Sequence, residues 1–139
     1  MIGVVVVTHG QLATELVNST EMIVGDLPRF AAVSIGWHED THEARAAIEQ
    51  AIARVEHGQG VLILTDMFGG TPSNLAMTFL GENKAEVITG VNLPMLIKLA
   101  GLIEKSDLLT AAREMREHGR NAIWVASDLL RGDKGDDRK

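Results

Sequence analysis

Residues 2–10 read Ile-Gly-Val-Val-Val-Val-Thr-His-Gly. The apolar, β-branched run at Ile2–Val7 has no polar alternation, which predicts a strand over these residues that is buried on both faces. Thr8, His9 and Gly10 end the run, and the residues after them have helical spacing. A fully buried strand that is followed directly by a helix is typical of a parallel sheet covered by helices.

Apolar runs of strand length alternate with helical patterns along the rest of the chain. Further strands are expected at Phe30–Ile35, Val61–Thr65, 86–89 and 121–126. Helices are expected at 11–24, between Asp40 and Gly58, and at 71–80, 92–99 and 106–119. The alternation predicts an α/β fold with an open, mostly parallel sheet and helices on both faces. We expect one domain over residues 1–130 and a disordered tail at 131–139.

Single residues predict how two of these helices begin and which face the first one buries. Leu12, Leu16 and Ile23 fall on one stripe of the first helix, which should face the core. Thr71 precedes a proline and is the expected N-cap of the third helix. Ser106 is the expected N-cap of the last one.

Composition and charge exclude several classes of function. The chain of 139 residues holds 13 Lys and Arg against 19 Asp and Glu, which gives a net charge of −6. Such an acidic chain is a poor electrostatic partner for nucleic acid, and no basic run predicts contact with a membrane surface. The absence of Cys excludes disulfides, thiolate zinc sites and Cys nucleophiles. The apolar N-terminus is too short for a signal or membrane-spanning segment, so we expect a cytoplasmic protein.

The candidate chemistry lies where the predicted strands end, because open α/β sheets bind ligands outside the carboxyl ends of their strands. His9 precedes a helix start, whose backbone N–H groups would favour an anion beside the imidazole. Asp66 follows the third strand and can accept a hydrogen bond from an imidazole N–H, which fixes the tautomer. Gly69 and Gly70 let the backbone approach a ligand, and Thr71 offers a hydroxyl. The residues alone also allow a surface histidine and an ordinary strand-to-helix turn.

The spacing of two further histidines raises the question of a metal site. His38 and His42 are four residues apart and lie among acidic residues. No His-Glu-x-x-His pattern is present, and a solvated helix start explains the same residues. We therefore predict no metal site.

Three segments go beyond a generic α/β pattern: VVVVTHG at 4–10, GVLILTDMFGGTPSNLA at 60–76 and EVITGVNLPML at 86–96. Together they resemble the enzyme IIA domain of the mannose-type phosphoenolpyruvate-dependent sugar phosphotransferase system. The resemblance covers about residues 1–126. It implies a parallel sheet of order 2-1-3-4 and a dimer in which a C-terminal strand, here residues 121–126, is exchanged between subunits.

The resemblance also implies the roles of the two titratable residues. His9 would accept a phosphoryl group from the phosphocarrier HPr and donate it to a separate IIB protein, while Asp66 pairs with the imidazole. Phe68 and Thr71 stand where the family often has Trp and Ser. The chemistry needs positioning and electrostatics rather than a cofactor or metal.

Further residues would hold the phosphoryl group or meet the partner proteins. Gly10, Gly69, Gly70 and Thr71 are the predicted phosphoryl-binding positions, through backbone N–H groups and the Thr71 hydroxyl. The rim that contacts partners is predicted at Trp37, Phe68, Leu93 and Met95. Contact with a membrane would then be indirect, through a transporter complex.

Other readings of the same residues stay open. The protein could serve sugar transport or report phosphorylation state as a regulator. The phosphotransfer subunit of dihydroxyacetone kinase is a related alternative with a different partner. A small phosphatase with a His9 nucleophile and a ligand-sensing module are alternatives from other classes.

Overall fold

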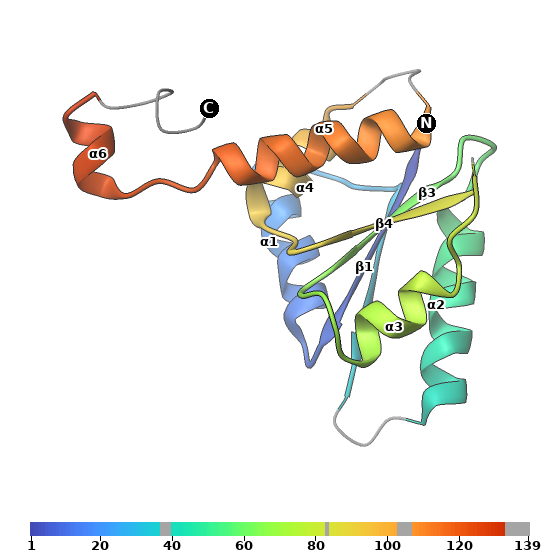
Figure 1. The fold of residues 1–139 in the computed structure, drawn as a ribbon. Coiled ribbons are helices and arrows are strands. Elements are labelled where there is room, and N and C mark those ends of the chain that lie inside the picture. The colour runs from blue at the N-terminus through green and yellow to red at the C-terminus, as the bar shows by residue number, and fades with distance from the viewer. Residues whose placement is uncertain (37–39, 83, 103–106, 133–139) are drawn as a thin grey trace.

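The computed structural model describes residues 1–36, 40–82, 84–102 and 107–132 (Figure 1). The predicted rim residue Trp37, the histidine at position 38 and the predicted cap Ser106 lie outside these ranges. The strands are β1 (Gly3–His9), β2 (Phe30–Ile35), β3 (Val61–Thr65) and β4 (Ala85–Thr89). The helices are α1 (Leu12–Val24), α2 (Thr41–Val55), α3 (Thr71–Met77), α4 (Leu93–Ala100), α5 (Leu108–Asn121) and α6 (Ala126–Leu130).

The four strands form one parallel sheet in the order β2-β1-β3-β4, which confirms the predicted order. The bounds of β2 and β3 match the sequence prediction, because both strands are continuous apolar runs between turn residues. β1 extends further than predicted at its C-terminal end and includes His9 as its last residue. The pairing of Val7 with Thr65 brings the carboxyl ends of β1 and β3 side by side.

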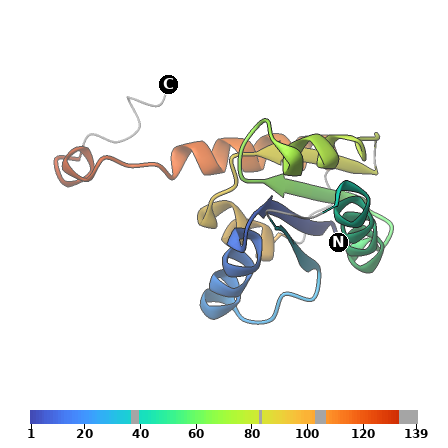
Figure 2. The same ribbon diagram turned by 90° about the horizontal axis from the view of Figure 1, so that it is seen from below.

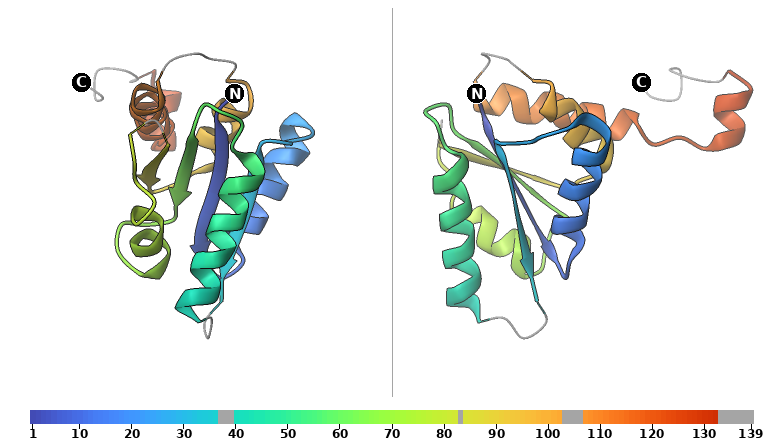
Figure 3. Two further views of the ribbon diagram at one scale, coloured as in Figure 1. Left: turned by 90° about the vertical axis from the view of Figure 1, so that its right-hand side faces the viewer. Right: turned by 180° about the vertical axis from the view of Figure 1, so that it is seen from behind.

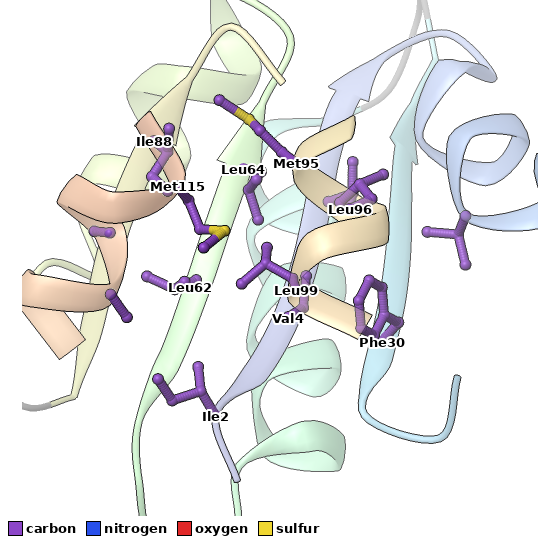
Figure 4. Close-up of a cluster of buried hydrophobic side chains, with 14 of the residues drawn as sticks. Ile2, Val4, Phe30, Leu62, Leu64, Ile88, Met95, Leu96, Leu99 and Met115 are labelled. Carbon is purple, nitrogen blue, oxygen red and sulfur yellow. The ribbon is translucent and has the colours of Figure 1, made fainter. Parts of the chain in front are cut away.

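Two hydrophobic clusters cover the two faces of the sheet. Val4, Val6 and Leu62 pack under α1, α4 and α5. Figure 4 shows Val4 and Leu62 within this cluster. Val5 and Ile63 point to the opposite face and pack under α2 and α3. Figure 1 shows these two helix groups on opposite sides of the strands, and Figure 2 shows α1 and α2 on either side of the sheet. This arrangement confirms the prediction of strands that are buried on both faces.

Two details of the predicted helices are wrong. The fully buried residues of α1 are Ala13, Val17 and Thr20; of the predicted stripe, Leu16 packs against the core in part, whereas Leu12 and Ile23 are exposed. The buried stripe therefore lies about one residue away from the predicted one. The third helix also starts one residue early, because Thr71 is already helical and the preceding glycine holds the N-cap position.

The predicted fifth strand is not formed in the single chain. Residues 122–125 follow α5 without strand pairing, and the short helix α6 comes next. Figures 1 and 3 show this C-terminal segment extending away from the sheet. The predicted tail lies outside the described residues from position 133 onward. Across the described residues, no helix is long and apolar enough to span a bilayer.

Candidate functional site

His9 and Asp66 meet where β1 and β3 end. The ring Nδ1 of His9 lies 2.8 Å from Asp66 Oδ2, and the same oxygen accepts the backbone N–H of His9 at 3.1 Å. The side chain of His9 is 52% exposed and that of Asp66 is 15% exposed. The carboxylate is therefore much less exposed than the ring. Its contact with Nδ1 leaves the other ring nitrogen, Nε2, for a reaction partner.

The pKa of Asp66 reflects this position. Burial raises the pKa of the carboxyl group, but the hydrogen bonds from the His9 ring and backbone, together with attraction to a protonated ring, outweigh that effect. The pKa of Asp66 therefore lies below its ordinary value. An ionised Asp66 favours the tautomer with the proton on Nδ1, which leaves the lone pair on Nε2.

Hydroxyl groups hold the turn that carries His9. The buried Thr8 Oγ1 accepts the N–H of Ala13 at 2.6 Å and donates to the carbonyl oxygen of His9 at 3.1 Å. Ser34 Oγ accepts the next N–H of the helix, that of Thr14, at 3.3 Å. These side chains replace an N-cap, because Gln11 makes no capping bond. The sequence does not indicate this role, since a Thr at a strand end gives no capping pattern next to the helix.

A glycine loop borders the ring on the other side. Gly69 and Gly70 both have positive φ angles, of 95° and 91°, which side-chain-bearing residues rarely adopt. A Cβ atom on Gly70 would lie 3.1 Å from both Cε1 and Nε2 of His9. The exposed Thr71 follows at the first turn of α3. The structure therefore brings His9, Asp66 and Gly70 together, and Thr71 follows Gly70 in the chain.

The predicted donor groups are not all free. The N–H of Gly10 donates to the carbonyl oxygen of Ile35 at 2.8 Å, and the N–H of Gly69 donates to Ser73 Oγ at 2.8 Å. Neither amide can hold a phosphoryl oxygen without breaking its bond. The role of Gly10 is conformational, because its φ angle of 58° lets the chain turn from β1 into α1.

The predicted rim is only partly exposed. Phe68 is 73% exposed and lies two residues after Asp66. Leu93 is half-buried, whereas Met95 is buried in the core and lies directly on Gly119. The prediction of Met95 as a rim residue is therefore wrong. Met95 is the third residue of α4, and its side chain packs against Gly119 of α5.

A family model described as "PTS system fructose IIA component" matches residues 3–116. The chain belongs to this family. The match spans all four strands and both residues of the His9–Asp66 pair, and it confirms the resemblance to the mannose-type IIA proteins.

Individual relatives agree with the family match. The chain is 30% identical to the fructose-specific EIIA component of Bacillus subtilis, covering 94% of this chain and 90% of the relative. It is 34% identical to the mannose-specific EIIAB component of Escherichia coli, over 70% of this chain and 30% of that longer protein. The mannose/sorbose-specific IIA subunit of Enterococcus faecalis superposes with a TM-score of 0.80 at 29% identity, covering 89% of this chain and 93% of that one.

This IIA protein is thus a phosphoryl carrier of the sugar phosphotransferase system, a phosphotransferase that works through histidine. It functions alongside the phosphocarrier and IIB components of that system. The comparisons do not favour the dihydroxyacetone kinase subunit, the phosphatase or the ligand-sensing module. Among the described residues, no group of three or more His, Asp or Glu is placed to hold a metal ion.

Proposed function

We propose that Nε2 of His9 is the atom that carries the phosphoryl group in this IIA protein. The observation that carries the proposal is the 2.8 Å contact between His9 Nδ1 and Asp66 Oδ2. This contact occupies one ring nitrogen and leaves the other with its lone pair in an exposed position. Among the described residues, no other histidine forms an ion pair with a carboxylate.

In the proposed step, the Nε2 lone pair of His9 forms a bond to the phosphorus of a phosphohistidine donor. The bond between phosphorus and the donor nitrogen breaks, and its electron pair returns to the donor imidazole. The ring of His9 then carries a proton on Nδ1 and the phosphoryl group on Nε2, with a positive charge spread over both nitrogens. The Asp66 carboxylate balances this charge, which lowers the free energy of the transition state as well.

The phosphoryl oxygens would lie between the starts of α1 and α3. On the α3 side, the N–H groups of Gly70 and Thr71 and the Thr71 hydroxyl remain as donors, since Gly69 is engaged by Ser73. On the α1 side, Thr8 and Ser34 occupy the amides of Ala13 and Thr14, which leaves the amide of Leu12 in the first turn. Backbone N–H groups at such positions stabilise charge on phosphoryl oxygens.

The partners would dock on the apolar surface around the ring. Leu12, Met67 and Phe68 are exposed and lie close to His9 or Asp66 in the chain. A phosphohistidine protein such as HPr must bring its own ring against Nε2, and a shallow apolar surface permits this approach. A separate IIB protein would use the same surface to accept the phosphoryl group.

We further propose that the protein forms a homodimer by exchange of residues 121–126. Ile123 and Val125, two positions apart, are 71% and 64% exposed. Such exposure is unusual for two large apolar side chains so close together in the chain. A groove of about 280 Å³ follows the outer edge of β4 and is lined in part by Val87, Thr89 and Leu109. A strand from a second copy would satisfy the open edge of β4.

Intact-protein mass after incubation with phosphoenolpyruvate, enzyme I and HPr tests the proposed site. We expect one acid-labile phosphoryl group on the wild-type protein and on a His57→Ala control, which removes an exposed histidine after α2. The His9→Ala variant should gain none. Labelling of His9→Ala at the wild-type level would overturn the proposal. Absence of labelling on the wild-type protein would overturn it as well.

A further inference from the structure

Ser73 has a buried hydroxyl group inside the site's own framework. Its side chain is fully buried in the first turn of α3. The N–H of Gly69 donates to Ser73 Oγ at 2.8 Å. A buried hydroxyl is retained where it is hydrogen-bonded, because an unpaired one is costly. This bond therefore ties the loop between β3 and α3 to the helix that follows it.

The loop needs such a tie because two adjacent glycines form it. Gly69 and Gly70 both hold positive φ angles, and glycine loses more conformational freedom on ordering than any other residue. No other side chain of the described residues accepts a hydrogen bond from either glycine. Without the Ser73 acceptor, several loop conformations would compete with the one observed.

The position of the loop matters at the reacting atom. Gly70 lies so close to His9 that a Cβ atom there would be 3.1 Å from Nε2. Asp66 fixes the ring from the Nδ1 side, and Gly70 borders it from the Nε2 side. A shift of the loop by a fraction of an ångström changes both the space around Nε2 and the direction of the Gly70 and Thr71 N–H groups.

We propose that Ser73 is a positioning residue for phosphoryl transfer at His9, acting through Gly69 and Gly70. The proposal rests on the proposed function of His9. Ser73 touches neither the ring nor the phosphoryl group. It sets the loop conformation in which Nε2 is open on one side and faces amide donors on the other.

Single-turnover transfer from phospho-HPr to Ser73→Ala tests this inference. We expect the transfer rate at saturating donor to fall roughly 10- to 100-fold, because small misplacements of reacting groups cost that much. The donor concentration at half-maximal rate should not change, since the docking surface is intact. Hydrogen exchange of the Gly69 amide should become faster, which reports the lost bond without any phosphoryl chemistry.

A matched control separates positioning from general destabilisation. Thr78→Val removes a hydroxyl at the other end of α3, which donates to the Leu75 carbonyl oxygen and accepts a hydrogen bond from Arg45. This variant should transfer at the wild-type rate. The role of Ser73 would be overturned if Ser73→Ala transferred at the wild-type rate, or if Ser73→Ala and Thr78→Val lost the same rate. In either case, labelling of the wild type would still uphold the proposed function. Absence of labelling in the wild type would overturn both.

Discussion

One oxygen of Asp66, Oδ2, accepts both the ring Nδ1–H and the backbone N–H of His9, at 2.8 and 3.1 Å. The backbone bond fixes the carboxylate relative to the end of β1, and the ring bond then fixes the imidazole relative to the carboxylate. The ring orientation therefore does not depend on a partner protein. His9 is prepared for transfer before a donor binds, which reduces the cost of reaching the reactive geometry.

The charge of Asp66 can be separated from its shape by Asp66→Asn. The amide oxygen of the substituted side chain could still accept the Nδ1–H bond, but it cannot balance the positive charge on a phosphorylated ring. We expect the transfer rate from phospho-HPr to fall roughly 10²-fold or more, with little change in donor binding. Rapid-quench measurement of the single turnover checks this, and a wild-type rate would show that the carboxylate only orients the ring.

The low pKa of Asp66 predicts how stability depends on pH. A carboxyl group whose folded pKa lies below its ordinary value of 3.8 stabilises the fold above that value, and the contribution disappears as pH falls through the folded pKa. The free energy of unfolding of the wild type should therefore exceed that of Asp66→Asn near neutral pH, and the difference should shrink below about pH 4. Urea unfolding of both proteins across this range measures it. A difference that does not depend on pH would contradict the assignment.

Gly70→Ala should affect the reaction more than the fold. The new methyl group would lie 3.1 Å from Nε2, and the backbone conformation of Gly70, with φ 91° and ψ 170°, would cost about 1–3 kcal/mol of stability for an L-residue. Gly25→Ala is the matched control, because Gly25 has a φ angle of 95° and open space around the added carbon. Both variants should lose similar stability in thermal unfolding, whereas only Gly70→Ala should lose labelling by phospho-HPr.

Thr8→Val tests the hydroxyl that replaces the N-cap of α1. The substitution keeps the shape of the side chain but leaves the N–H of Ala13 without its acceptor, at a cost of about 1–3 kcal/mol in unfolding free energy. The control is Thr20→Val, since Thr20 is equally buried but its hydroxyl only donates to the Leu16 carbonyl oxygen. Denaturant unfolding should show a clearly larger loss for Thr8→Val, and equal losses would show that the cap is unimportant.

The four strands of the sheet were predictable from their continuous hydrophobicity, whereas their order came from the family resemblance. β2 and β3 are continuous apolar runs between turn residues, so their bounds match the sequence prediction. Helix faces were less predictable. In α1, a stripe through Leu12 and Leu16 and one through Ala13 and Val17 differ by one residue, and only the contact with the sheet decides between them.

The pair at the centre of the site was predictable because His9 and Asp66 lie at the carboxyl ends of two parallel strands, and the strand order implied by the family resemblance makes these strands neighbours. The supporting residues were not. Ser73 forms its bond with a loop residue four positions earlier, and Thr8 caps a helix from within a strand. Met95 was misassigned because a short apolar helix gives no indication of which side faces the core.

The exposed segment after α5 yields the last prediction. Ile123 and Val125 alternate, so in an exchanged strand both side chains would face the same side of the partner's sheet. The double variant Ile123→Asp and Val125→Asp places charges there, while both positions are exposed in the single chain and should not disturb its fold. Light scattering should give about twice 15.0 kDa for the wild type and 15.0 kDa for the double variant.

The control is Leu130→Asp, at an exposed position of α6, which should remain dimeric. A monomeric wild type, or a double variant that stays dimeric, would show that residues 121–126 do not hold two copies together.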